Sequence, residues 1–243
     1  MPHARVGNIA KTGGRALALR LRRDLATLGA SLCIMTYTAQ AGGIPSRTSP
    51  TSDVQWWDEI DLTVPINAQL DFTWVSWVRM SEDTGGPVTY ANGAEAGLKL
   101  GDKVTLNPSF YSYESFKVTT QHWVQTREPR VAAIFTTQLR PCALSDRNLM
   151  AFVTGSGESY RVYRIRPKIE CGILGKRMLS LFVWDECFYY SQYDRWTRNR
   201  FADGVHLQVN NRWGMEIFYV HQIDGEATPR DINGLGMTLQ LRW

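Results

Sequence analysis

The chain has 243 residues, 44% hydrophobic and 12% aromatic, a composition that excludes an intrinsically disordered protein. The formal net charge of +4 does not indicate nucleic-acid binding, because the basic excess is confined to the N-terminus. The basic residues there, opposed only by Asp24, are Arg5, Lys11, Arg15, Arg20, Arg22 and Arg23. We therefore expect no nucleic-acid partner.

Residues 1–41 are organised as a secretory signal peptide. A basic region ends at Arg23, and an apolar stretch follows from about Leu25 to Tyr37. Ala39 and Ala41 then form an A-x-A cleavage signal, so the mature chain is expected to begin near residue 42. Residues 42–53, rich in Gly, Pro, Ser and Thr, are expected to form a flexible N-terminal segment. For residues 1–41, the alternative to a signal peptide is an amphipathic helix of a soluble protein.

From residue 54 to residue 243, apolar residues recur at every second position, which is typical of β-strands. This part contains no run of about 18 apolar residues, so it has no predicted transmembrane helix. The prediction is an all-β fold, a single antiparallel up-and-down transmembrane β-barrel. Eleven candidate strands can be found, but such barrels normally have an even number of strands, so we expect about 10–12. The candidate strands are 54–65, 69–80, 89–100, 103–115, 128–140, 144–154, 159–171, 178–190, 199–210, 213–222 and 234–243.

The predicted connections alternate in length. Short turns follow the odd-numbered strands, whereas longer loops at 81–88, 116–127, 191–198 and 223–233 follow most of the even-numbered ones. This rhythm is typical of outer-membrane barrels, which have short periplasmic turns and long outer loops. It places the C-terminus on the periplasmic side.

Charged side chains alternate with apolar ones on several of these strands. Each Arg or Lys on the lipid-facing side would cost roughly 2–4 kcal/mol, so we assign the charged face to the lumen. They either line a path that favours anions or form ion pairs that fill the lumen. The lumen-lining candidates are Arg164, Arg166, Lys168, Glu170, Glu186, Arg200, His206 and Glu216.

The last strand ends on an aromatic residue and alternates strictly. Its apolar face, Leu235, Met237, Leu239, Leu241 and Trp243, is predicted to be the signal read by the barrel-assembly machinery.

The tryptophans and the cysteines carry further expectations. The nine Trp residues are predicted to form girdles at the membrane interfaces. Cys142, Cys171 and Cys187 lack the C-x-x-C spacing of a metal site. Export permits one disulfide among them without requiring it, and we favour their packing as small hydrophobic residues.

Several residues carry a resemblance to a known family. They are Trp56, Tyr160-Arg161-x-x-Arg164-x-Arg166, Asn199-Arg200, Gly204, the turn Asn211–Gly214 and the terminal Trp243. Together they resemble a bacterial family of outer-membrane β-barrels known as a domain of unknown function of the 2490 type, over most of residues 53–243. The resemblance implies a barrel and an outer-membrane location. It implies no catalytic residue, ligand or cofactor.

The predicted function is a small outer-membrane channel with an Arg/Glu-lined lumen and no enzymatic activity. None of His122, His206 and His221 lies in the H-x-S-N-G arrangement of outer-membrane phospholipases. One alternative is a non-conducting structural or surface-binding barrel that uses its long loops, and another is a lipid-modifying enzyme. The expected partners are outer-membrane lipids and the barrel-assembly machinery, with no metal or cofactor.

Overall fold

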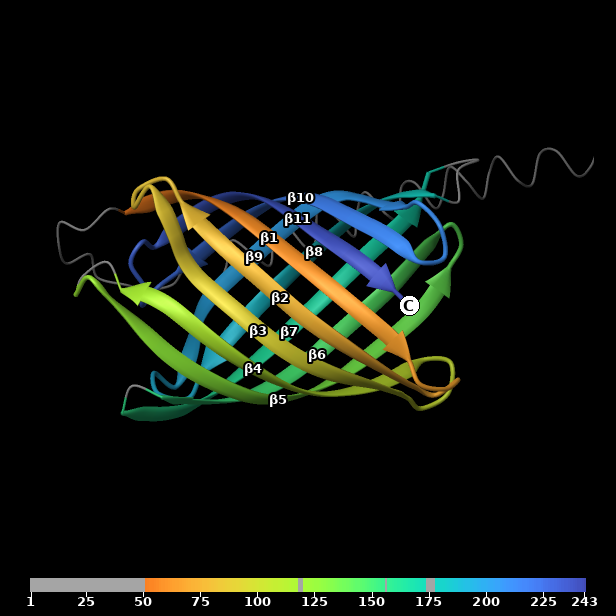
Figure 1. Cartoon of the computed structure of the whole chain (residues 1–243), viewed down its shortest axis with the longest axis horizontal. Coiled ribbons are helices and arrows are strands. Elements are labelled where there is room, and N and C mark those ends of the chain that lie inside the picture. Colours follow the sequence, from red (N-terminus) through yellow and green to blue (C-terminus); the bar gives the residue numbers. More distant parts are fainter. Residues whose placement is uncertain (1–50, 118–119, 156, 174–177) are drawn as a thin grey trace, which may run out of the picture. The chain divides into compact units, whose positions relative to one another are not determined.

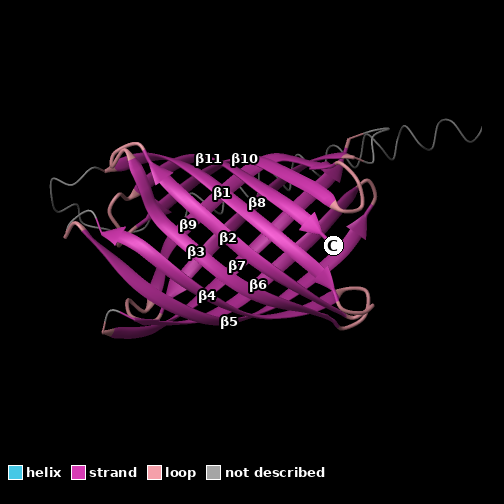
Figure 2. Ribbon diagram, in the orientation of Figure 1, coloured by secondary structure: helices cyan, strands magenta, loops and turns pink. Residues whose placement is uncertain are grey.

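The computed structural model describes residues 51–243, except 118–119, 156 and 174–177. In this part of the chain, eleven strands pair in sequence order and close into a barrel (Figures 1 and 2). The strands are β1 (Ser52–Pro65), β2 (Leu70–Ser81), β3 (Gly86–Lys99), β4 (Val104–Lys117), β5 (His122–Leu139), β6 (Cys142–Gly155), β7 (Glu158–Gly172), β8 (Leu179–Tyr190), β9 (Arg195–Gln208), β10 (Trp213–Asp224) and β11 (Asp231–Arg242). The predicted all-β barrel is confirmed.

The odd strand number determines how the barrel closes. Neighbouring strands alternate in direction, so the first and the eleventh run the same way. β1 therefore pairs with β11 in parallel, with Trp56 opposite Leu235 and Leu62 opposite Leu241. All other neighbouring strands are antiparallel, as predicted, and this seam is the one departure from a purely antiparallel barrel.

The predicted contrast between short turns and long loops is wrong. We call the end at which residues 66–69, 100–103, 140–141 and 209–212 connect the strands the C-terminal rim. We call the end at which residues 82–85, 191–194 and 225–230 connect the strands the N-terminal rim. The connections at the two rims have similar lengths, because residues assigned to long loops extend the strands instead. β5, for example, begins at His122 rather than near residue 128.

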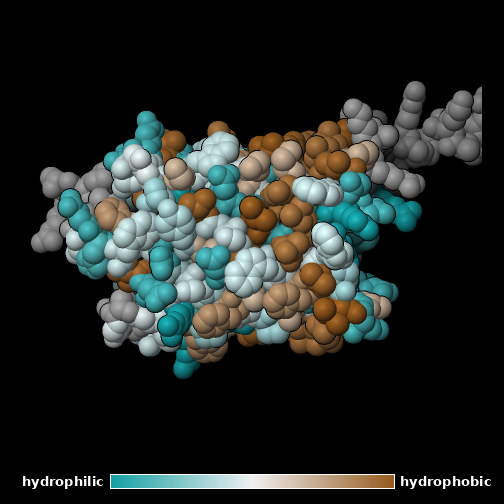
Figure 3. Space-filling model, viewed as in Figure 1, coloured by the Kyte–Doolittle hydropathy of each residue, from teal (hydrophilic) through white to brown (hydrophobic). Residues whose placement is uncertain are grey.

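The outer face of the wall changes in character along the barrel. On β2 to β5, a row of polar residues, Ser76, Asn92, Ser112 and Arg127, lies side by side across the strands. One step nearer the C-terminal rim, the corresponding residues are Trp74, Ala94, Phe110 and Pro129. The face visible in Figure 3 is correspondingly more hydrophobic towards the C-terminus and more hydrophilic towards the N-terminal rim. Polar outer residues are the reason that these strand ends resemble loops in the sequence.

A disulfide joins two neighbouring strands close to the C-terminal rim. Cys142 of β6 and Cys171 of β7 are directly opposite in register and are bonded, whereas Cys187 is free. For Cys142 and Cys171, the expectation of unbonded hydrophobic packing is therefore wrong. The register that brings them together comes from strand pairing and cannot be inferred from their separation of 29 residues.

We expect thiol labelling of the denatured, unreduced protein to modify Cys187 and to spare Cys142 and Cys171. Reduction before labelling should expose all three cysteines, and peptide mapping by mass spectrometry reads each position separately. Labelling of Cys142 or Cys171 without reductant would contradict the bonded pair.

Two predictions concern residues at the N-terminus. The signal peptide with its cleavage positions Ala39 and Ala41 lies outside the described residues. Residues 42–50 of the expected flexible segment lie outside them as well. Within the described residues, no helix is long and apolar enough to cross a membrane.

Candidate functional site: the charged lumen

The interior of the barrel contains a cavity of about 1530 Å³. Its walls include Asn211 and Arg212 of the C-terminal rim, and Asp83 and Gln192 of the N-terminal rim. Lumen-facing side chains from the strands form the wall between them, since every second residue of a strand points to the same face. One cavity therefore extends from one rim to the other.

Arginines gather around one buried carboxylate in the middle of the wall. Glu186 of β8 is 1% exposed, and its oxygens lie 2.6 Å from Arg147, 2.9 Å from Arg164 and 3.6 Å from Arg200. Arg200 also donates two hydrogen bonds to the Gln222 side-chain oxygen. Three guanidinium groups thus share one carboxylate, which leaves this part of the lumen positively charged.

Other arginines extend this group. Arg198 forms an ion pair with Asp224 near the N-terminal rim. Arg79 and Arg166 line the cavity but form no ion pair with any carboxylate of the described residues. We call this set the arginine cluster: Arg79, Arg147, Arg164, Arg166, Arg198 and Arg200.

Acidic residues gather nearer the C-terminal rim. Asp61 lies within electrostatic reach of Glu59, Glu95 and Glu216, and all four line the cavity. Glu95 accepts hydrogen bonds from Asn107 and Tyr111 of β4. The lumen is therefore divided into an arginine-rich part and an acidic part.

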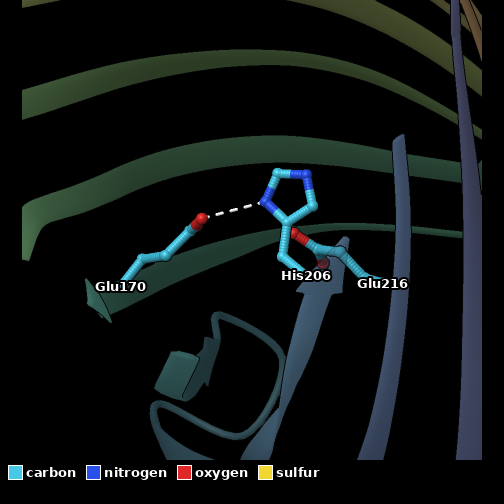
Figure 4. A group of neighbouring side chains, drawn as sticks. All are labelled: Glu170, His206 and Glu216. Atoms are coloured by element: carbon cyan, nitrogen blue, oxygen red, sulfur yellow. Dashed lines mark hydrogen bonds and ion pairs between the residues drawn. The ribbon is translucent and has the colours of Figure 1, made fainter. Parts of the chain in front are cut away.

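Lys168, Glu170, His206 and Glu216 form a polar group beside the acidic part. The Lys168 ammonium lies 3.2 Å from Glu170 and 2.9 Å from Glu216, and the His206 Nδ1 atom is 2.9 Å from Glu170. Figure 4 shows the three side chains Glu170, His206 and Glu216 gathered together, with the imidazole bonded to Glu170. Glu170, His206 and Glu216 each have one ligand atom within 4.8 Å of the ligand atoms of the other two. Carboxylate oxygens and imidazole nitrogens are donor types that bind divalent metals. However, the Lys168 ammonium already contacts both carboxylates, so a metal would have to displace it.

The structure places the eight lumen candidates on the interior face. Glu186 binds Arg164 and Arg200, whereas Glu170 and Glu216 bind Lys168, and Arg166 has no carboxylate partner among the described residues. Arg166 nevertheless lies within electrostatic reach of Glu59 and Glu186.

Several lumen residues were missed in the sequence. Arg79, Arg147 and Arg198 carry charge into the cavity. Arg79 shares a face of β2 with Trp77, which was itself assigned to an outer girdle, and that face mixes apolar and polar residues. The contacts that matter cross between strands, so alternation alone does not reveal them.

The tryptophans do not all form interface girdles. Trp57, Trp77 and Trp184 line the cavity, contrary to the prediction. Strand parity separates Trp57 from its neighbour Trp56, which is 43% exposed on the outside. The remaining outward-facing tryptophans are exposed: Trp74, Trp123, Trp196, Trp213 and Trp243. On β11, Leu235, Met237, Leu239 and Leu241 share the outer face.

Comparison with known proteins gives the family. Residues 54–233 match the family described as "Protein of unknown function (DUF2490)". A search of curated proteins gives no match. Among solved structures, a NanC porin is 11% identical with a TM-score of 0.48, covering 74% of this chain and 93% of the porin. LpxR from Salmonella typhimurium is 8% identical with a TM-score of 0.49, covering 74% of this chain and 86% of LpxR.

Proposed function

We propose that this chain, which belongs to the family described as "Protein of unknown function (DUF2490)", is an outer-membrane channel for small solutes. The observation that carries the proposal is the interior cavity, which is lined by residues of both rims. A barrel filled by its own side chains would have no cavity reaching both rims.

The size of the cavity suggests the size of the solute. A 12-residue strand tilted by about 40° rises about 30 Å along the barrel axis. A volume of about 1530 Å³ spread over that height corresponds to a mean cross-section of about 50 Å² open to the centre of a water molecule. This width admits water, inorganic ions and small organic molecules.

The outer wall supports a membrane location. About 9–11 residues of a tilted strand cross the hydrocarbon, whereas the strands here have 12 to 18 residues. The apolar outer residues nearer the C-terminal rim fit the lipid, and the polar rows nearer the N-terminal rim fit water. We infer that the wall projects beyond the bilayer at the N-terminal rim.

The proposed partners follow from this location. Outer-membrane lipids would contact the apolar part of the wall. The barrel-assembly machinery would read the outer face of β11 and its terminal Trp243 during export through the periplasm.

The proposal assigns no reaction to the chain. Ser180, Glu170 and His206 lie together, which invites comparison with a catalytic triad. However, Ser180 donates its hydrogen bond to Glu170, and His206 Nε2 has no partner among the described residues. A serine nucleophile needs a hydrogen bond to its general base, and this arrangement lacks it. The lipid-modifying alternative predicts lipid turnover that is lost on changing His206 to Ala.

Planar-bilayer recording tests the channel. The purified barrel is expected to insert and to give discrete, lasting steps of current in KCl. A mock preparation from cells without the protein should give none. Correctly folded barrel that inserts without conducting would contradict the proposal and favour a non-conducting structural or surface-binding role.

A further inference from the structure

Arg79 of β2 is held in the lumen by aromatic rings. Its guanidinium carbon lies 3.7 Å from the centre of the Trp57 ring and 4.5 Å from that of Trp77. Trp57 is directly opposite Arg79 in the β1–β2 register, and its indole nitrogen donates to Gln55. These contacts fix the Arg79 guanidinium over the Trp57 ring. The ring covers one face of the guanidinium, and the N–H groups at the guanidinium edge remain available for a ligand.

The charges around Arg79 are not balanced by the protein. Arg164, Arg198 and Arg200 lie within its electrostatic reach, and each of them has a carboxylate partner. The Glu59 carboxylate lies within the same reach but forms no ion pair with Arg79 among the described residues. Arg79 has no carboxylate partner among the described residues, and its Nε atom is buried without a hydrogen bond. The next acid towards the N-terminal rim, Asp53, already accepts bonds from Gln55 and Ser81. An enclosed cation without a partner is unfavourable, so an anion at this position would stabilise it.

We propose that Arg79 is the binding residue for an oxyanion group, a carboxylate or a phosphate, on the solutes that enter the lumen. A guanidinium edge donates two parallel N–H bonds, which matches the two oxygens of such a group better than a spherical ion. Arg79 lines the cavity, so a solute reaches it from the rims. The inference rests on the proposed channel, because it names the class of solute that the channel takes.

Equilibrium binding in detergent tests the site without requiring conduction. The purified barrel is titrated calorimetrically with sodium acetate and, separately, with sodium phosphate, at constant ionic strength. We expect saturable binding of at least one of the two anions, and the two titrations distinguish a carboxylate site from a phosphate site. Sodium chloride at the same concentration should compete weakly, since it cannot accept two parallel bonds.

Two substitutions locate the binding. Arg79→Gln is expected to weaken the affinity about tenfold or more, in line with the loss of a charged hydrogen bond. Arg79→Lys, which keeps the charge without the fork, should fall between. Arg195→Gln, at an exposed rim ion pair with Glu226, should leave the affinity unchanged. Trp fluorescence and the denaturant midpoint verify that each variant is folded.

Unchanged affinity in both folded Arg79 variants, or no saturable binding of either anion to the wild type, would overturn the inference. Neither result depends on the conductance of the wild-type barrel, so neither would contradict the proposed channel function. Binding with no conductance would support the site and overturn the channel.

Discussion

Replacing Glu186 with Gln is expected to lower the free energy of unfolding of the barrel by about 3–5 kcal/mol. The Glu186 carboxylate is 1% exposed and is shared by Arg147, Arg164 and Arg200. Gln keeps the shape but removes the negative charge, so three guanidinium groups lose their common counterion inside the wall. Breaking a buried pair on one side leaves uncompensated charge, which costs far more than losing an exposed pair.

The measurement is urea unfolding of the detergent-folded barrel, followed by Trp fluorescence. The matched control is Glu226→Gln, the same chemical change in a pair whose partner Arg195 is 53% exposed. That variant should change stability by less than about 1 kcal/mol. Equal effects of the two substitutions would show that the pairs around Glu186 do not hold the wall together.

Replacing Gly204 with Ala should also destabilise the barrel, by about 1–3 kcal/mol. Gly204 of β9 is opposite Phe218 of β10, and a Cβ there would collide with the backbone oxygen of Ile217 and lie 2.8 Å from the Phe218 Cα atom. Backbone atoms of a paired strand cannot move aside without disturbing the sheet. The Phe218 ring in turn lies over Gly236 of β11, so the clash would spread to a second strand.

Gly214→Ala is the matched control for this substitution. A Cβ at Gly214 would meet the side-chain oxygen of Gln240 at 3.1 Å and His206 Nε2 at 3.3 Å, both at the ends of movable side chains. Removing a glycine from a strand also favours folding slightly, so this variant should be neutral or somewhat more stable. The same urea titration compares the two, and a Gly204→Ala barrel as stable as Gly214→Ala would contradict the packing described.

The sequence predicted the strands well because alternation is a local property. Each of the eleven candidate segments corresponds to a strand, from the Val54 region to the last strand before Trp243. The ends towards the N-terminal rim were less predictable. Residues such as Asn92 and Arg127 are polar on the outer face, which is a signature that strands and loops share.

The site was harder to predict because it depends on pairing across the barrel. Glu186 and Arg164 could be placed in the lumen from alternation, but Glu186 meets Arg147, which lies 39 residues away on another strand. The parallel seam between β1 and β11 and the Cys142–Cys171 bond depend equally on register. Arg79 went unnoticed because its partners are aromatic rings rather than charges of opposite sign.

Solutes are proposed to pass through the lumen, which is lined by the side chains that strand alternation places on the interior face. Thr73 and Ser76 of β2 test it as a pair, because Thr73 lines the cavity and Ser76 lies in the polar outer row. Each is changed to Cys, and a cationic thiol reagent is added during planar-bilayer recording, with mass spectrometry confirming modification.

Modified Thr73→Cys is expected to lose current, because the added group narrows a lumen whose mean cross-section is about 50 Å². Modified Ser76→Cys should conduct as before, and so should the wild type, whose free Cys187 is not among the residues that line the cavity. Undiminished current through fully modified Thr73→Cys, or equal block of the two variants, would contradict a path through the barrel interior.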